Sequence, residues 1–201
     1  MPKINAATIH EHKEKTRAAL LDSGAAAFVR FGLAGTSIGT LADEAGIART
    51  TVYEYFPNKE AILAALIEER IPPVVALTIT DLPDLGPAPR LAEILRRGFR
   101  LVSEFPVEAT LMFRVSRELP KPERDEAWSV FDDVRAEVVR LCIAGIESGE
   151  FGPTDPRSLG TIVADHLVGG IDELSSRPEA DADVIIESRI EFLRHGLGPI
   201  D

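Results

Sequence analysis

Residues 36–60 read TSIGTLADEAGIARTTVYEYFPNKE, and this stretch decides the fold of the N-terminal part of the chain. Its first part predicts a short helix that Thr36 or Ser37 caps. Gly46 follows where a helix commonly ends on a left-handed residue, and a second short helix is expected over residues 49–55. The apolar residues of the first helix recur at helical spacing and form its inner face: Ile38, Leu41, Ala42 and Ala45. Two short helices joined by such a tight turn predict a helix-turn-helix.

The second helix of this motif has an apolar side and a polar side. Val52 and Phe56 are four residues apart and are predicted to pack inward, with Tyr53 beside them. The residues that then point away from the core are mostly hydrogen-bonding types: Arg49, Thr50, Thr51, Glu54 and Tyr55. The sequence therefore predicts a polar helix face that is available to a partner.

A third helix is expected directly after the motif. Pro57 ends the second helix, Asn58 is a favourable N-cap, and Lys59 opens the next amphipathic helix. A lysine in the first turn of a helix opposes the helix dipole. A nearby phosphate would explain this lysine, because helix N-termini and ammonium groups both attract anions.

Residues 36–60 resemble the DNA-binding domain of the TetR family of bacterial transcriptional repressors, and the resemblance extends upstream into residues 17–32. It implies that the helix over residues 49–55 enters the major groove of DNA and that its aromatic end, with the lysine that follows, contacts phosphates. The resemblance assigns DNA contacts to Thr36, Thr40, Arg49, Thr50, Thr51, Tyr55 and Lys59. Two positions depart from the family pattern, because Ala48 replaces the usual serine cap and Glu54 places a negative charge beside the DNA face. The structural alternative is a two-helix corner of some other all-α core, which the combination of turn length, glycine and lysine disfavours.

The charge of the chain is unevenly distributed. The chain has 201 residues and a formal net charge of -11 at pH 7. Residues 1–60 carry 7 Lys and Arg against 7 Asp and Glu, whereas residues 61–201 carry 15 against 26. A neutral DNA-binding segment predicts few phosphate contacts, with specificity left to well-placed hydrogen bonds.

The apolar segments of the chain are too short to cross a bilayer, and its first residues lack the apolar core of a signal peptide. A cytoplasmic protein without membrane contact is therefore expected. The single cysteine, Cys142, lies among apolar residues and is expected to be a small buried side chain. No spacing of His and Cys suggests a metal site, and no cofactor is expected.

The remainder of the chain predicts further helices. Helices over residues 8–31 and 59–75 frame the motif, and Pro72-Pro73 is expected to break or kink the second of them. Residues 76–89 are rich in Pro, Asp and Gly and suggest a linker. Apolar periodicity then predicts helices over residues 90–104, 106–119, 123–148, 157–176 and 181–197. We therefore expect an all-α fold of about nine helices, with a three-helix helix-turn-helix domain over residues 1–70. Residues 71–201 would form a helical ligand-binding and dimerisation domain.

The last two expected helices each carry a broad apolar stripe. The stripes comprise Leu159, Ile162, Val163, Leu167, Ile171 and Leu174 on one helix, and Ile186, Ile190, Leu193 and Leu197 on the other. A monomer would expose these residues, so the helices are predicted to pair with those of a second chain in a four-helix bundle. Gly169-Gly170 is expected to admit another backbone. A two-fold dimer implies a near-palindromic DNA operator.

The leading hypothesis is a repressor that binds its operator as a homodimer and that a small-molecule effector releases, with the Lys59 helix as the moving link. By resemblance, the effector site would lie among the middle helices of the second domain. Its expected lining is Phe99, Met112, Phe113, Trp128, Phe131, Arg135 and His166. A DNA-binding regulator without a ligand stays open as an alternative. An enzyme is a weaker alternative, because the sequence contains no Gly-rich phosphate loop and no Gly-x-Ser-x-Gly motif.

Overall fold

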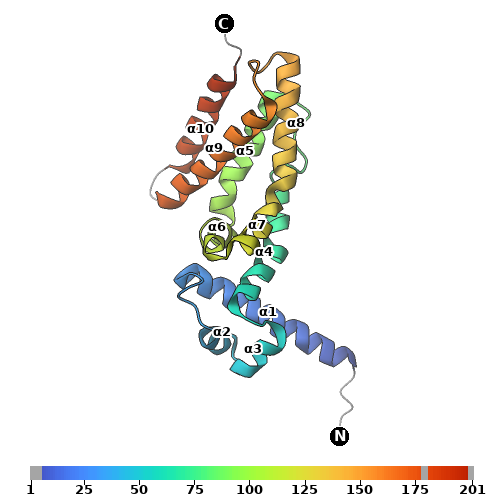
Figure 1. The fold of residues 1–201 in the computed structure, drawn as a ribbon, viewed down its shortest axis with the longest axis vertical. Coiled ribbons are helices and arrows are strands. Elements are labelled where there is room, and N and C mark those ends of the chain that lie inside the picture. The colour runs from blue at the N-terminus through green and yellow to red at the C-terminus, as the bar shows by residue number, and fades with distance from the viewer. Residues whose placement is uncertain (1–5, 178–180, 199–201) are drawn as a thin grey trace. The chain divides into compact units, whose positions relative to one another are not determined.

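The computed structural model describes residues 6–177 and 181–198, and it is all-helical over these residues, as the sequence predicts. Two short 3-10 turns, η1 and η2, interrupt the series of α-helices (Figure 1). In chain order the elements are α1 (Ala6–Phe31), α2 (Ile38–Ala45), α3 (Arg49–Tyr55), α4 (Lys59–Ala76), α5 (Pro87–Glu104), α6 (Pro106–Phe113), η1 (Val115–Glu118), α7 (Lys121–Trp128), η2 (Ser129–Phe131), α8 (Asp132–Ser148), α9 (Pro156–Ser176) and α10 (Ala182–Leu197).

Backbone contacts group the helices into two compact units. The first unit runs up to Ile71 and also contains Val107–Ala127, and the second contains Pro72–Pro106 and the chain from Trp128 onward. Residues 107–127 therefore pack with the helix-turn-helix, although they follow α5 in the chain. The assignment of residues 71–201 to a ligand-binding and dimerisation domain stays a prediction.

The core of the first unit forms where α1 packs on α4. Leu20 and Phe28 of α1 are fully buried, as are Ile62 and Leu66 of α4. Gly24 lies at the crossing, and a Cβ atom there would press against the Ile62 side chain. The absence of a side chain at this position therefore allows the two helices to approach each other closely.

Helix α4 does not end at its two prolines. It continues through Pro72 and Pro73 to Ala76, so the helix is not broken there, and a kink at the prolines stays a prediction. Both proline rings lie on the exposed side of the helix. There, water can bond the carbonyl groups that lose their backbone partners, and the cost of keeping proline in a helix is smaller than in a packed interior.

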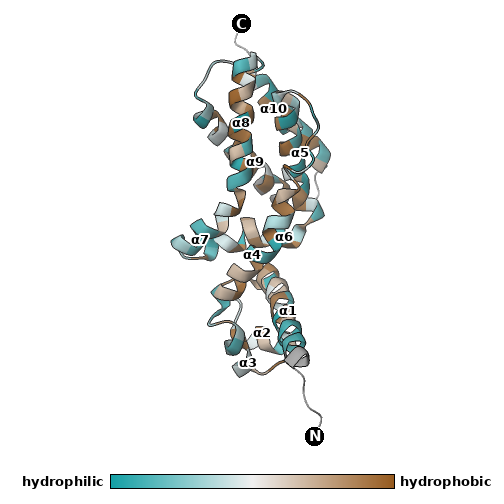
Figure 2. Ribbon diagram, turned by 90° about the vertical axis from the view of Figure 1, so that its right-hand side faces the viewer, coloured by the Kyte–Doolittle hydropathy of each residue, from teal (hydrophilic) through white to brown (hydrophobic). Residues whose placement is uncertain are grey.

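Two other predicted helices are interrupted in the structure. Residues 106–119 form α6 followed by the 3-10 turn η1, and residues 123–148 lie in α7, η2 and α8 rather than in one helix. Helix α7 has the sequence KPERDEAW and buries no residue fully, and Figure 2 shows it largely in the hydrophilic colour. Helix α7 has no apolar stripe that continues the stripe of α8. Packing against a core therefore does not require the two segments to form one continuous helix.

The second unit is a bundle in which α5, α8, α9 and α10 pack on one another. The fully buried Phe99 ring of α5 lies against Gly170 of α9, where a Cβ atom would overlap it. Within the unit, the close approach at Gly170 is therefore made by an aromatic side chain, and the expectation that another backbone lies at Gly169-Gly170 stays a prediction.

Candidate DNA-binding surface and ligand pocket

The helix-turn-helix has the end geometry that its sequence predicts. Ser37 caps α2, and its Oγ accepts a hydrogen bond from the backbone N–H of Thr40 at 3.0 Å. Gly46 ends α2 in the left-handed conformation, with φ of 66°. Leu41 and Ala42 bury the inner face of α2. These contacts fix the angle at which α3 leaves the turn.

Helix α3 presents most of its surface to solvent. Val52 and Phe56 are buried as predicted, and they anchor the helix to the unit. Tyr53 was expected to pack beside them, but 49% of its surface is exposed. Arg49 and Tyr53 are four residues apart, which places them one above the other on the outer face. The sequence therefore already contained the spacing that makes Tyr53 part of the exposed face.

The N-terminus of α3 lacks a side-chain cap. Ala48 occupies the N-cap position in an extended conformation and makes no side-chain hydrogen bond to the helix. This agrees with the sequence, which places an alanine at the cap position. The first backbone N–H groups of α3 have no acceptor within the helix. Because Ala48 offers them no side-chain acceptor, they can donate to water or to a phosphate.

The residues predicted to contact DNA divide into exposed and enclosed side chains. Arg49 and Thr50 are exposed, and Thr40, Thr51 and Tyr55 are half-buried. Thr36 is only 3% exposed, and its hydroxyl donates a hydrogen bond to the Gly32 carbonyl at 2.7 Å. Five of the predicted contact residues, Thr40, Arg49, Thr50, Thr51 and Tyr55, are thus accessible on α2 and α3. The Thr36 side chain is buried instead.

Lys59 is held by the loop between α1 and α2. Its Nζ donates to the carbonyls of Leu33 at 2.6 Å, Thr36 at 3.0 Å and Ala34 at 3.4 Å. An ammonium group has three N–H donors, so these carbonyls account for all of them. To donate a hydrogen bond to a DNA phosphate, Lys59 must break its hydrogen bond to at least one of these carbonyls. The phosphate role of Lys59 stays a prediction.

Residues distant in sequence also contact this loop and the end of α1. Glu118 of η1 accepts a hydrogen bond from the Ala34 backbone N–H at 2.8 Å. Arg114, at the end of α6, donates to the Val29 carbonyl near the end of α1. Sequence reasoning missed both side chains, because no local pattern indicates a contact across more than 80 residues of chain.

An ion pair ties α1 to α4 near the end of α3. Arg17 donates through both Nη atoms to the carboxylate of Glu69, with Nη1 at 3.0 Å from Oε2. The Arg17 guanidinium also lies 5.6 Å from the centre of the Phe56 ring, at the end of α3. The hydrogen bond from Arg17 lowers the pKa of Glu69 below its ordinary value. The pair therefore connects three helices of the first unit.

The side chains predicted to line an effector site are divided between the two units, and their common role stays a prediction. Phe99 is packed against Gly170 in the second unit, whereas Met112 and Phe113 belong to the first. Arg135 is exposed and pairs with Asp132 one helical turn away. The Nε2 of His166 lies 3.1 Å from the Arg189 carbonyl, and its ring stacks on Phe192. Trp128 and Phe131 contact each other near η2, with ring centres 5.6 Å apart.

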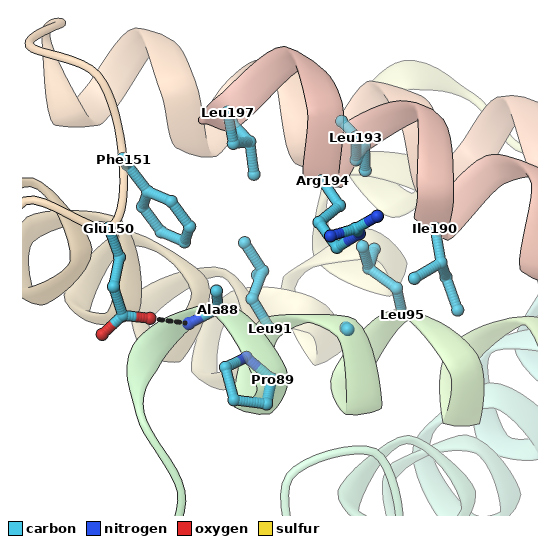
Figure 3. Close-up of a pocket in the computed structure, with 11 residues that line it drawn as sticks. Ala88, Pro89, Leu91, Leu95, Glu150, Phe151, Ile190, Leu193, Arg194 and Leu197 are labelled. Carbon is cyan, nitrogen blue, oxygen red and sulfur yellow. Dashed lines mark hydrogen bonds between the residues drawn. The ribbon is translucent and has the colours of Figure 1, made fainter. Parts of the chain in front are cut away.

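The second unit contains a pocket that sequence reasoning did not identify. It lies between α5, the turn after α8 and α10, and its volume is about 210 Å³ (Figure 3). Its lining is Ala88, Pro89, Leu91, Ala92, Leu95, Glu150, Phe151, Ile190, Leu193, Arg194 and Leu197. None of the seven predicted effector-site residues lines this pocket. The sequence analysis assigns Ile190, Leu193 and Leu197 of this lining to a helix stripe, and periodicity alone does not distinguish a filled interface from a hollow one.

Comparison with known proteins identifies the first unit. A family model described as bacterial regulatory proteins, tetR family, matches residues 20–66, from the middle of α1 into α4. Residues 20–66 therefore belong to the DNA-binding region of the TetR family. Among curated proteins, the transcriptional regulator RutR of Escherichia coli K12 is 26% identical over 142 residues. The match covers 70% of this chain but 66% of RutR, which is slightly under two thirds of that protein's length.

Solved structures show that the TetR-family likeness of the fold extends to the second unit. The regulator FadR of Bacillus subtilis, in complex with stearoyl-CoA, has a TM-score of 0.76 at 20% identity and matches 90% of this chain and 98% of its own. A tetR-family regulatory protein from Rhodococcus RHA1 has the same TM-score at 19% identity, over 92% and 98% of the two chains. These similarities establish the arrangement of helices. Within the described residues, no helix has both the length and the apolar content that crossing a membrane requires.

Proposed function

We propose that this TetR-family chain is a transcriptional repressor that reads a near-palindromic DNA operator with α3. The observation that carries the proposal is the outer face of α3, where Arg49, Thr50 and Tyr53 are exposed while Val52 and Phe56 fix the helix from behind. Arginine donates bidentately to guanine, and threonine and tyrosine bond base edges or phosphates. Thr51 and Tyr55 extend this surface toward the end of the helix.

The proposed repressor is a homodimer that pairs through α9 and α10. The predicted apolar stripes can supply only part of the interface, because Val163, Ile171, Ile186 and other members of them are buried within their own unit. One stripe residue is accessible, since Ile162 is 57% exposed, and Phe192 outside the stripes is 70% exposed. Pairing of two chains would cover these side chains, which supports a dimer over this face.

The proposed dimer releases its operator when a small molecule binds the second unit. Helix α4 supports this coupling, because it begins beside the helix-turn-helix and its last turn belongs to the second unit. An effector that favours one placement of α4 changes the separation of the two reading helices. A coupling of about 1 to 3 kcal/mol lowers DNA affinity by about 5- to 150-fold, and DNA lowers effector affinity by the same factor.

Selection from a pool of random DNA duplexes tests the proposal. The purified protein is expected to enrich one sequence with two inverted half-sites, because each protomer of a two-fold dimer reads one of them. The half-site spacing should correspond to one or more helical turns of DNA. Enrichment of a single unrepeated half-site would contradict the dimer, and no enrichment over a protein-free control would contradict specific DNA binding.

A further inference from the structure

The pocket between α5, the turn after α8 and α10 has apolar walls from three directions. Leu91 and Leu95 face it from α5, and Leu193 and Leu197 face it from α10 (Figure 3). Phe151 forms its third wall. Its ring lies against Gly145, where a Cβ atom would overlap the ring, so the position of Phe151 is fixed by α8. The backbone N–H of Gly152 also donates to the Leu197 carbonyl at 2.9 Å, which ties the turn to the end of α10.

The end of the pocket at the start of α5 offers a ligand no backbone hydrogen-bond donor. The Ala88 N–H donates to Glu150 Oε2 at 3.0 Å, and Glu150 Oε1 lies 3.2 Å from the Ser148 hydroxyl. Pro87 and Pro89, on either side of Ala88, have no N–H. The carboxylate of Glu150 also repels anions from this end. An anionic ligand group is therefore disfavoured at this end.

The α10 side of the pocket carries a guanidinium with unused donors. Arg194 reaches from α10 toward α5 and lines the pocket (Figure 3). Glu191 accepts from its Nε at 3.1 Å and from its Nη2 at 2.6 Å. A guanidinium has five N–H donors, and within the described part of the chain Nη1 of Arg194 makes no hydrogen bond. Since 63% of the Arg194 side chain is exposed, it can turn toward a second carboxylate at small cost.

The volume of the pocket limits the size of a ligand. An engineered cavity of about 150 Å³ lined by Leu, Ile and Phe side chains holds benzene. A volume of about 210 Å³ exceeds that cavity by less than half and suits one or two fused aromatic rings or a short alkyl chain. It is too small for a peptide helix, whose diameter with side chains is about 10 to 12 Å.

We propose that this pocket binds a small aromatic or short-chain carboxylic acid. The apolar body of the ligand lies against Leu91, Leu95 and Phe151, and its carboxylate accepts hydrogen bonds from the free donors of Arg194. The ligand is oriented in this direction because Glu150 repels the carboxylate at the opposite end. This assignment goes beyond the proposed regulatory function, because it names a binding site and a ligand class without requiring that the protein bind DNA.

The test uses 2-naphthoate as the probe and the full-length protein without DNA. Titration is followed by the methyl NMR signals of the leucine and isoleucine side chains. We expect saturable binding with a dissociation constant on the order of 1 mM, as for a ligand of this size with ordinary efficiency. The shifts should be largest for Leu91, Leu95, Ile190 and Leu193. Absence of saturation, or shifts centred on other residues, would overturn the site.

Two variants and a neutral probe test the ligand class. Arg194→Gln should weaken 2-naphthoate binding about three- to tenfold and leave binding of the uncharged 2-naphthamide unchanged. Ala92→Phe fills the pocket and should abolish binding of both probes. Arg140→Gln is the matched control, because Arg140 donates to Glu137 one turn away in the same manner and does not line the pocket. If Arg194→Gln affected neither probe, the carboxylate assignment would be wrong.

Discussion

Lys59 has a structural role at the residue scale that can be separated from its predicted role in DNA binding. Its ammonium group bonds the carbonyls of Leu33, Ala34 and Thr36, which the loop between α1 and α2 presents to it. Lys59→Ala leaves partly buried carbonyls without a donor. We expect a loss of about 1 to 3 kcal/mol in the free energy of unfolding, measured by urea denaturation.

The same variant tests the phosphate contact. If Lys59 contacts a phosphate, Lys59→Ala lowers the slope of log affinity against log salt by about one, on specific and nonspecific duplexes alike. Lys13→Ala is the control, because Lys13 is an exposed lysine of α1 outside the reading surface. An unchanged slope together with reduced stability would show that Lys59 holds the loop and does not contact DNA.

The Arg17–Glu69 pair predicts a dependence of stability on pH. Because the hydrogen bond from Arg17 lowers the folded-state pKa of Glu69, the pair stabilises the fold above the ordinary glutamate pKa of 4.5. That contribution is lost as the pH falls through the lowered value. We therefore expect Arg17→Gln to reduce the melting temperature at pH 7 and to reduce it less at pH 3. An equal reduction at both pH values would show that packing on Phe56, rather than the ion pair, accounts for the effect of Arg17.

At the scale of elements, η1 holds the loop that precedes α2. The Glu118 carboxylate accepts from the Ala34 N–H and lies against Gly32, whose φ of 72° requires a left-handed backbone. Glu118→Leu removes the acceptor, whereas Glu118→Gln keeps one. We expect hydrogen exchange at Ala34 to be faster in the leucine variant and close to wild type in the glutamine variant. Equal exchange rates in all three proteins would contradict a holding role for η1.

The elements also show which features a sequence can predict. Capping residues and apolar periodicity are local, so the caps Ser37, Gly46 and Asn58 were predicted correctly. The buried positions Leu41, Ala42, Val52 and Phe56 were predicted for the same reason. The division of residues 123–148 was missed, because periodicity in α8 was extended into the polar α7. The prediction that Tyr53 packs inward is wrong, because its position on α3, four residues after Arg49, places it on the outer face.

The candidate site required information that local patterns do not contain. Glu118 meets Ala34 only after the chain has folded, so neither residue is marked in the sequence. The pocket depends on how closely α5 and α10 approach, and Leu91 and Leu193 have the same periodicity whether the space between them is filled or hollow. The predicted effector residues rest on residue type, which does not determine whether side chains meet, and their role stays a prediction.

At the scale of the whole molecule, the proposed dimer predicts that exposed apolar residues of α9 and α10 control oligomeric state. Ile162→Glu and Phe192→Glu place a charge on the proposed interface, and together they should convert the dimer to a monomer in light scattering. Ile143→Glu is the matched control, since Ile143 is also an exposed apolar residue but lies on α8. A wild-type protein of monomeric mass at micromolar concentration would contradict the proposal.

The central claim is that α3 reads the DNA sequence, and fluorescence anisotropy with matched duplexes tests it most directly. Wild type, Arg49→Ala and the control Arg30→Ala are titrated with the selected operator and with duplexes changed at single base pairs. We expect Arg49→Ala to bind the operator more weakly by about 1 to 3 kcal/mol and to lose discrimination at one base pair in each half-site, while Arg30→Ala retains both. Unchanged discrimination at every base pair in Arg49→Ala would contradict the assignment of α3 as the reading helix.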